Sequence, residues 1–164
     1  MSEMKKVFIG IDPGANGAMA ILEEGKAPRL VCCDYERYRL ELQEVVFPQT
    51  EEDLRRGLRA RVAVEDVHAM PMNGCVGNFK LGWSLGRIIQ IVDFYLVPRQ
   101  LVKPQQWQKE YGISNRDKSK SQSIETAKRL FPGVDLRRTV KCTKDHDGFA
   151  DALLIAEWCR RHLA

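Results

Sequence analysis

The stretch VFIGIDPGANGAMAIL, residues 7–22, constrains the fold more than any other part of the chain. An apolar run ends at Asp12, a short Pro- and Gly-containing segment follows, and a second apolar run begins at once. Asn16-Gly17 is the kind of pair that adopts the positive φ angles of a tight connection between antiparallel strands. The stretch therefore predicts a strand over 5–12 that ends on a carboxylate, and a second strand over 17–23.

The rest of the chain alternates apolar β-branched runs with helical patterns. Pro98 cannot donate a backbone hydrogen bond, so a strand that contains it lies at a sheet edge or is bulged. Thr50 is a good helix N-cap and is followed by acids, which favour the first turn of a helix. Further strands are predicted over 28–34, 61–68 and 95–102. Helices are predicted over 51–60, 79–94, 104–110, 119–130 and 148–163, with residues 131–147 irregular.

This order, three strands followed by strands that alternate with helices, predicts an α/β fold with a mixed sheet and helices packed against it. The 164 residues suit a single domain over 1–164. Hydrophobic residues make up 44% of the chain and charged residues 29%, which is usual for a soluble globular protein. The composition therefore excludes a low-complexity or fibrous chain.

No stretch of the sequence is apolar and long enough to predict a membrane span, so no membrane partner is expected. The N-terminal MSEMKKVFIGID runs directly into the first predicted strand, without the apolar region and cleavage site of a signal peptide. The five cysteines form an odd set without CxxC spacing, which predicts reduced thiols and no zinc site. Together these features predict a cytoplasmic protein.

Positive charge is concentrated in one part of the chain. The net charge is +4, but residues 99–144 contain 12 Lys and Arg against 4 Asp and Glu. Such a segment is expected to bind a polyanion, although a solvated lysine-rich face remains the alternative. Its SNRDKSKSQS stretch mixes hydroxyls with cations, the groups that donate to phosphates, or else is only a soluble helix entry. The candidate DNA contacts are Lys103, Trp107, Lys109, Arg116, Lys118 and Lys120.

Four acids occupy positions that packing alone explains poorly. Asp12 ends the first strand, Glu65 lies in the apolar VAVEDV, and Asp147 and Asp151 lie four residues apart on one face of the last helix. A carboxylate in an apolar segment is costly unless it is paired or bound to a cation. Carboxylate oxygens favour Mg²⁺ or Mn²⁺, and two such ions at a phosphate would hydrolyse a phosphodiester.

Each acid also has a structural interpretation. Asp12 before Pro-Gly could start a turn, and Glu65 could pair with an arginine from 55–61. Asp147 could cap the last helix, and Asp151 could stabilise the N-terminus of that helix electrostatically. The set of four, rather than any one member, therefore carries the metal-site hypothesis.

Three motifs, IGIDPGANGAMAIL, VAVEDVHAMPMNG and HDGFADALLIAEW, occur in this order along nearly the whole chain. Together they resemble the RuvC-like Holliday junction resolvases, especially their bacteriophage branch. The resemblance implies a ribonuclease-H-like fold, with a five-stranded sheet of three antiparallel and two parallel strands flanked by helices. It also implies a homodimer that uses two Mg²⁺ or Mn²⁺ ions per active site. Such an endonuclease makes paired nicks in four-way DNA junctions during recombination and repair, leaving 5′-phosphate and 3′-hydroxyl ends.

By position, the resemblance implies that Asp12, Glu65 and Asp151 are catalytic metal ligands. It leaves the fourth ligand open between Asp147, Asp145 and His146, because bacterial members space their last two acids three residues apart. That spacing would place an acid at Gly148. Lys144 and His146 are also candidates for charge neutralisation or proton transfer.

Two further segments bear on the resemblance. Bacterial members have an aromatic wedge after the glutamate, where this chain has DVHAM, so His68 is the candidate to probe the junction centre. The helix over 79–94 corresponds to the dimer helix of the family and contains Phe79, Trp83 and Gly86. The alternative is that this helix only covers its own sheet.

Three other functions compete with junction resolution. A different ribonuclease-H-like nuclease would use the same acids on flaps, branched or single-stranded DNA, or RNA–DNA hybrids. An actin-like or sugar-kinase ATPase shares the strand-Asp-x-Gly-turn-strand pattern, but needs two lobes, which 164 residues do not provide. A DNA-binding module without catalysis would gain nothing from four converging acids.

Overall fold

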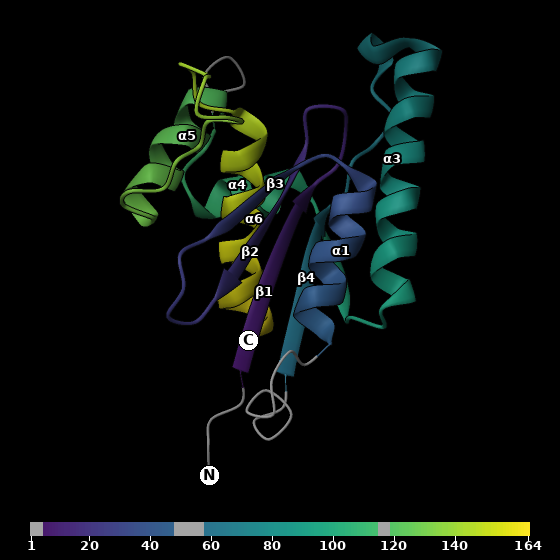
Figure 1. Cartoon of the computed structure of the whole chain (residues 1–164). Coiled ribbons are helices and arrows are strands. Elements are labelled where there is room, and N and C mark those ends of the chain that lie inside the picture. The colour runs from purple at the N-terminus through teal and green to yellow at the C-terminus, as the bar shows by residue number, and fades with distance from the viewer. Residues whose placement is uncertain (1–4, 48–57, 115–118) are drawn as a thin grey trace.

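A computed structural model describes residues 5–47, 58–114 and 119–164 (Figure 1). One sheet holds five strands in the order β3-β2-β1-β4-β5. The three N-terminal strands pair antiparallel, and β4 and β5 add parallel to β1. The element order predicts such a mixed sheet, and the resemblance implies its three antiparallel and two parallel strands. The strands are β1 (Lys5–Asp12), β2 (Ala18–Glu23), β3 (Arg29–Cys32), β4 (Leu58–Glu65) and β5 (Arg99–Val102).

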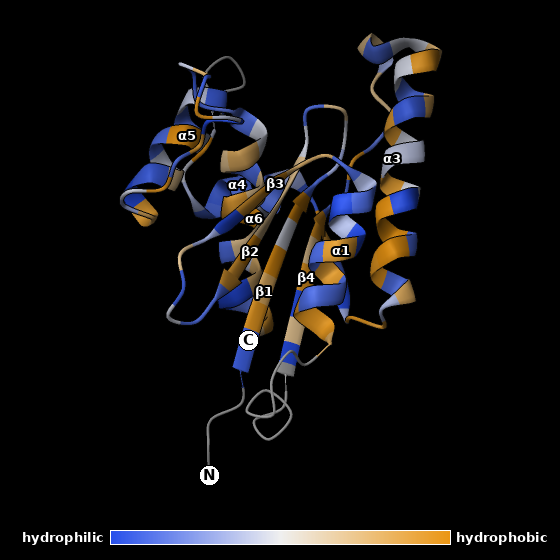
Figure 2. Cartoon of the chain, viewed as in Figure 1, coloured by the Kyte–Doolittle hydropathy of each residue, from blue (hydrophilic) through white to orange (hydrophobic). Residues whose placement is uncertain are grey.

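Helices cover both faces of the sheet. α1 and α3 lie on one face, and α6 lies on the other with α4 and α5 beside it (Figure 1). The helices are α1 (Tyr35–Val46), α3 (Gly74–Phe94), α4 (Pro104–Glu110), α5 (Ser119–Leu130) and α6 (Asp147–Leu163), with a 3₁₀ turn, η1 (Pro71–Asn73), before α3. The central strands are apolar along most of their length because both of their faces are buried (Figure 2).

The side-chain alternation of β1 divides the core into two halves. Ile9 and Ile11 are buried beneath α1 and α3, whereas Phe8 packs on the α6 side. Gly10 lies under α6 so closely that a Cβ there would be 2.2 Å from the backbone nitrogen of Ala156. Glycine at this position therefore lets α6 lie directly on β1, which brings the start of α6 to the end of the strand where Asp12 lies.

The structure contains a helix that the sequence analysis did not predict. Asp34 caps α1, because its Oδ1 accepts hydrogen bonds from the backbone nitrogens of Glu36 at 3.0 Å and Arg37 at 3.3 Å. The buried face of α1 consists of Tyr38, Leu42 and Val45, which follow helical spacing. This face of α1 packs against the β1, β2 and β4 side of the core that also contacts α3.

Most of the predicted 51–60 helix lies outside the described residues. Its last three residues belong to β4, so the prediction is wrong there: residues 58–60 pair with β1 instead. β4 consequently begins three residues before the predicted strand over 61–68 and ends at Glu65. The tertiary pairing with β1 outweighs the local helical pattern of this segment.

The remaining predicted boundaries shift by a few residues. α3 begins at Gly74 rather than 79, and the strand predicted over 95–102 shortens to Arg99–Val102. β5 is an edge strand, as Pro98 indicates, and the Pro98 carbonyl accepts a hydrogen bond from the Val62 backbone nitrogen. α4 and α5 match their predicted ranges, and 131–146 is irregular. Among the described helices, none is both long and apolar enough to cross a membrane.

Candidate active site

The ends of two neighbouring parallel strands and the start of one helix bring four acids together. Asp12 ends β1 and Glu65 ends β4, and these strands pair in register up to Ile11 and Val64. Asp147 and Asp151 lie in the first turns of α6. The pKa of Asp12 is well above its ordinary value, first because of burial and then because of the charges of Glu65, Asp151 and Asp147. The four carboxylates therefore interact electrostatically.

The β1–β2 turn positions the start of α6. Gly148 packs against this turn so closely that a Cβ there would lie 2.1 Å from the Asn16 carbonyl oxygen. No acid fits at 148 in this backbone, which is where the three-residue spacing of the bacterial resolvases would place one. The two acids of α6 are consequently four residues apart, at 147 and 151.

Asp12 and Glu65 form a hydrogen-bonded carboxyl pair. Burial raises the pKa of Glu65, while hydrogen bonds with Trp107 and Asp12 act in the opposite direction. Two buried carboxyl groups this close favour sharing one proton over ionising together. A cation bound at this pair would offset the burial and charge that raise the two pKa values.

Side chains of α4 and α5 contact Glu65, Asp147 and Asp151. The indole Nε1 of Trp107 donates to Glu65 Oε1 at 2.9 Å, and Lys120 Nζ lies 2.6 Å from Asp147 Oδ2.

Ser123 hydrogen-bonds to Asp151, but Asp151 Oδ1 is buried without a hydrogen-bond partner. Burial is the main reason that the pKa of Asp151 rises to about 7. By contrast, the Lys120 ammonium lowers the pKa of Asp147 against the opposing effect of burial.

Asp12, Glu65, Asp147 and Asp151 form the edge of the sheet that is called the acid edge below. Their carboxylate oxygens are the donors that a hard divalent cation prefers, although the side chains are not arranged around one. Within residues 5–47, 58–114 and 119–164, no three His, Cys, Asp or Glu side chains are grouped so as to hold a metal ion. Asp151 Oδ1 nevertheless remains without a partner, and a lysine ammonium already lies against Asp147. These all-oxygen ligands, with one buried oxygen unsatisfied, fit Mg²⁺ or Mn²⁺.

The structure corrects the prediction that Trp107 contacts DNA. The Trp107 side chain is fully buried and faces Glu65 rather than solvent. The prediction rested on an aromatic residue among cations, a pattern that does not distinguish a surface residue from a core residue. Lys103, Lys109 and Lys120 are exposed, so their predicted contacts with DNA stay predictions. Arg116 and Lys118 lie outside the described residues.

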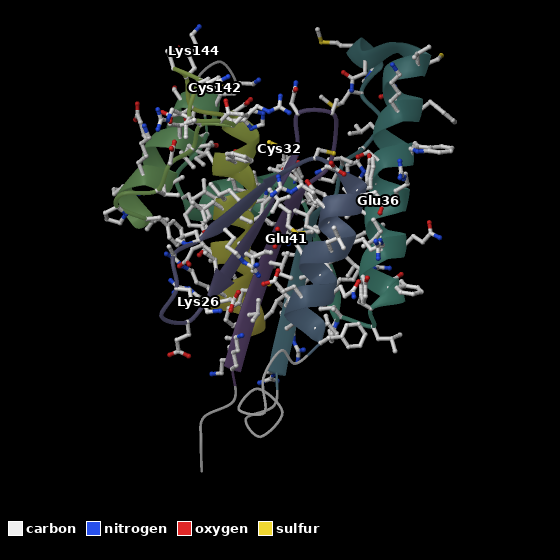
Figure 3. The ribbon with its side chains drawn as sticks, in the orientation of Figure 1. Lys26, Cys32, Glu36, Glu41, Cys142 and Lys144 are labelled. Atoms are coloured by element: carbon white, nitrogen blue, oxygen red, sulfur yellow. The ribbon has the colours of Figure 1, made fainter. Side chains whose placement is uncertain are left out.

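The alternative candidates beside α6 have partners of their own. Asp145 Oδ2 pairs with Lys128 Nζ of α5 at 2.5 Å. His146 caps α6, where its Nδ1 accepts a hydrogen bond from the Phe149 backbone nitrogen, and burial is the main reason that its pKa is lowered. Lys144 is exposed at the end of the molecule where β1 ends (Figure 3).

His68, the candidate probe of the junction centre, follows β4 and is exposed. Its Nε2 lies 3.7 Å from Asp66 Oδ2. The side chain is therefore accessible near the end of β4, three residues after Glu65.

The comparisons agree with this topology. No protein-family model matches the sequence, and no curated protein matches it. Among solved structures, "Thermus thermophilus RuvC structure" superposes with a TM-score of 0.56 and 21% identity over 94% of this chain and 95% of that one. The chain has a RuvC-like fold. "T. thermophilus RuvC in complex with Holliday junction substrate" gives a TM-score of 0.55 and 18% identity over 95% of both chains. The predicted ribonuclease-H-like fold is confirmed, while the bacteriophage branch stays a prediction.

Sequence reasoning missed two residues that contact the acids of this RuvC-like fold. Trp107 was placed on the surface, and Ser123 was not singled out. Ser123 is 2% exposed and lies four residues before the fully buried Ala127. A polar residue on the buried face of a helix was the available signal, because such a residue needs a hydrogen-bond partner.

Proposed function

We propose that this chain is a metal-dependent endonuclease that resolves four-way DNA junctions by hydrolysing phosphodiester bonds. The observation that carries the proposal is the convergence of Asp12, Glu65, Asp147 and Asp151 at one edge of a RuvC-like sheet. The T. thermophilus RuvC in the comparison was solved in complex with a Holliday junction substrate. Its fold covers nearly all of this chain, which supports a related substrate here.

Each of the four acids has a role in this proposal. They would hold two Mg²⁺ or Mn²⁺ ions, which supply Lewis-acid activation of water and neutralise charge that develops on the phosphate. For both Asp12 and Glu65 to act as ligands, both carboxyl groups must be ionised, which a bound cation favours. Lys120 must also release Asp147, and its ammonium then lies near the phosphate that enters the site. The products carry 5′-phosphate and 3′-hydroxyl ends.

The cations around the acid edge would bind the DNA backbone. Lys103, just before α4, and Lys109, on α4, are exposed, and Lys120 is exposed on α5. Lysine ammonium groups at these positions can neutralise phosphates without reading the base sequence. Further proposed contacts are His68, Lys144, His146, Arg116 and Lys118.

Resolution requires two cuts, and we assign the second active site to a second copy of the chain. α3 exposes large apolar side chains: Val76 is 68% exposed, Phe79 68%, Trp83 59% and Phe94 75%. The rings of Phe79 and Trp83 lie 6.0 Å apart, and neighbouring exposed apolar side chains of this kind are typical of protein interfaces. A pair of α3 helices would bury them.

A panel of DNA substrates tests the proposed function. The protein with Mg²⁺ is expected to cut a synthetic four-way junction faster than a flap, an RNA–DNA hybrid or a linear duplex, and EDTA should stop the cutting. Asp12→Asn should abolish cleavage and retain junction binding, while Glu24→Gln, which changes an exposed acid beyond the end of β2, should cleave normally. Preferential cutting of flaps or hybrids would support the other ribonuclease-H-like nucleases instead.

A further inference from the structure

Trp107 is fully buried, and its indole N–H points at one of the four acids. We propose that Trp107 is a positioning residue that fixes the carboxylate of Glu65 at the acid edge and thereby sets the metal affinity of the site. The inference rests on the metal site of the proposed function. It assigns a role to a residue that touches neither DNA nor the reacting phosphate.

The indole nitrogen explains why this core position holds tryptophan. Indole has a single donor and no acceptor, and Glu65 Oε1 at 2.9 Å takes that donor. A residue that only filled this core position could be apolar. A tryptophan there also buries an N–H, which is costly unless the N–H has a hydrogen-bond partner. The hydrogen bond to Glu65 therefore satisfies two buried groups at once.

The helix that carries Trp107 is capped at its start and attached to α6 just after its end. At its start, the Gln106 Oε1 accepts a hydrogen bond from the Lys103 backbone nitrogen at 3.0 Å. Just after its end, Tyr111 Oη donates to the Leu154 carbonyl of α6 at 3.1 Å. Because α6 also carries Asp147 and Asp151, α4 is held against the element that positions the other two acids.

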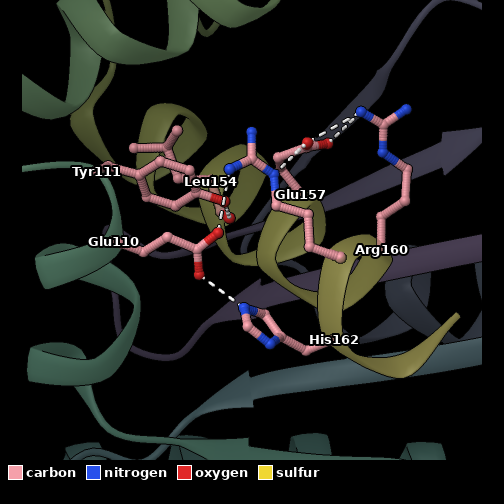
Figure 4. Close-up of polar contacts among 7 residues, drawn as sticks. Glu110, Tyr111, Leu154, Glu157, Arg160 and His162 are labelled. Carbon is pink, nitrogen blue, oxygen red and sulfur yellow. Dashed lines mark hydrogen bonds and ion pairs between the residues drawn. The ribbon is translucent and has the colours of Figure 1, made fainter.

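Ion pairs strengthen this attachment of α4 to α6. Glu110, the last residue of α4, contacts Arg161 at 3.1 Å and His162 at 2.7 Å near the end of α6 (Figure 4). Arg161 in turn pairs with the buried Glu157 at 2.8 Å. The indole is thus held by a helix that is attached to α6.

Glu65 Oε1 accepts the hydrogen bond from Trp107, whereas Glu65 Oε2 accepts none from that indole. Groups that orient a metal ligand from behind typically change metal affinity by about ten- to one-hundred-fold when they are removed. Loss of the indole N–H would leave Glu65 free to rotate away from Asp12. The effect is expected on metal binding before any DNA is present.

The test is Mn²⁺ binding to the DNA-free protein. Electron paramagnetic resonance measures the concentration of unbound Mn²⁺ during the titration. Trp107→Phe keeps an aromatic ring but removes the N–H, and should weaken Mn²⁺ binding about ten- to one-hundred-fold. Trp158→Phe is the matched control, because Trp158 is also buried but stacks on His162 with ring centroids 4.6 Å apart. This control should bind Mn²⁺ like the unmodified protein at a similar melting temperature.

Three outcomes would overturn the inference or its basis. Unchanged Mn²⁺ affinity in Trp107→Phe overturns the positioning role and leaves the proposed function intact. Equally weakened Mn²⁺ binding in Trp107→Phe and Trp158→Phe assigns the effect to general destabilisation, and this outcome also overturns the positioning role. If the unmodified protein binds no Mn²⁺, the metal site itself fails. Should Trp107→Phe not fold, benzothienylalanine at 107 keeps the ring shape without the N–H, and the same weakening is expected.

Discussion

Asp151 combines burial with an unsatisfied carboxylate oxygen on the first turns of α6. Its pKa of about 7 lies above the ordinary value of 3.8 because burial disfavours the charged form. An acid whose pKa is higher in the folded protein than in the unfolded chain binds more protons when folded. Its contribution to stability is therefore full below the unfolded pKa and is lost as the pH rises through about 7.

The metal-free protein should accordingly become less stable between pH 5 and pH 8. Asp12 contributes in the same direction, because its pKa is also raised. Asp151→Asn removes one of the titrating groups, so its melting temperature in EDTA should depend less on pH and exceed that of the unmodified protein at pH 8. Circular dichroism melting curves at several pH values measure both quantities.

Asp147→Asn is the matched control for this experiment. The pKa of Asp147 is itself lowered, and its charge is a smaller cause of the raised pKa values of Asp12 and Asp151 than burial is. This substitution should therefore leave the larger part of the fall in stability between pH 5 and pH 8 in place. An Asp151→Asn melting temperature that falls with pH as steeply as that of the unmodified protein would contradict the assignment.

At the scale of residues, the acids were predictable and their partners were not. Asp12 and Glu65 interrupt apolar strands, which is a signal that the sequence displays directly. Trp107 and Ser123 act through burial, and burial depends on how α4 and α5 pack on α6. A single sequence does not contain that information for two short helices from a basic segment.

Among the elements, α6 depends most on close backbone contacts. Gly10 and Gly148 allow it to rest on β1 and on the β1–β2 turn, where any side chain would overlap backbone atoms. Its N-terminal acids reach the ends of β1 and β4 only because of this contact. The placement of the acids is therefore a property of the helix–strand packing.

Gly148→Ala should disturb both stability and the site. Its Cβ would lie 2.1 Å from the Asn16 carbonyl oxygen, so the start of α6 must move. Such overpacking typically costs about 1–3 kcal/mol, which urea unfolding would measure. Junction cleavage should fall as well, because the shift displaces Asp147 and Asp151.

Gly82→Ala provides the comparison in α3, where a Cβ meets no heavy atom within 4 Å. Alanine there should stabilise the protein by about 0.5–1 kcal/mol, because glycine is a poor residue inside a helix. Equal stability changes in the two variants would contradict the proposed contact between α6 and the turn.

α1 shows why one element escaped the sequence analysis. Its helical spacing of Tyr38, Leu42 and Val45 is present, but charged and polar residues fill the intervening positions. The adjacent 51–60 segment offered a stronger cap and acidic first turn. Because β4 begins at Leu58, part of that segment serves as a strand instead.

At the scale of the whole molecule, the proposed function requires two copies of the chain. The protein should sediment as a dimer at micromolar concentration. Trp83→Lys places a charge within the apolar stripe of α3 and should give a monomer, which nicks only one strand of a junction. Val140→Lys, at an 83% exposed position before α6, should remain a dimer. A monomeric unmodified protein that still makes paired cuts would contradict this interface.

Mapping of the cut positions tests the central claim most directly. A four-way junction with immobile arms, labelled on each strand in turn, is incubated with the protein and Mg²⁺ beside Asp12→Asn. We predict two nicks placed symmetrically on opposing strands, with 5′-phosphate and 3′-hydroxyl ends that DNA ligase can seal, and none with Asp12→Asn. Cuts at unrelated positions, ends that cannot be ligated, or cleavage that survives Asp12→Asn would contradict the account.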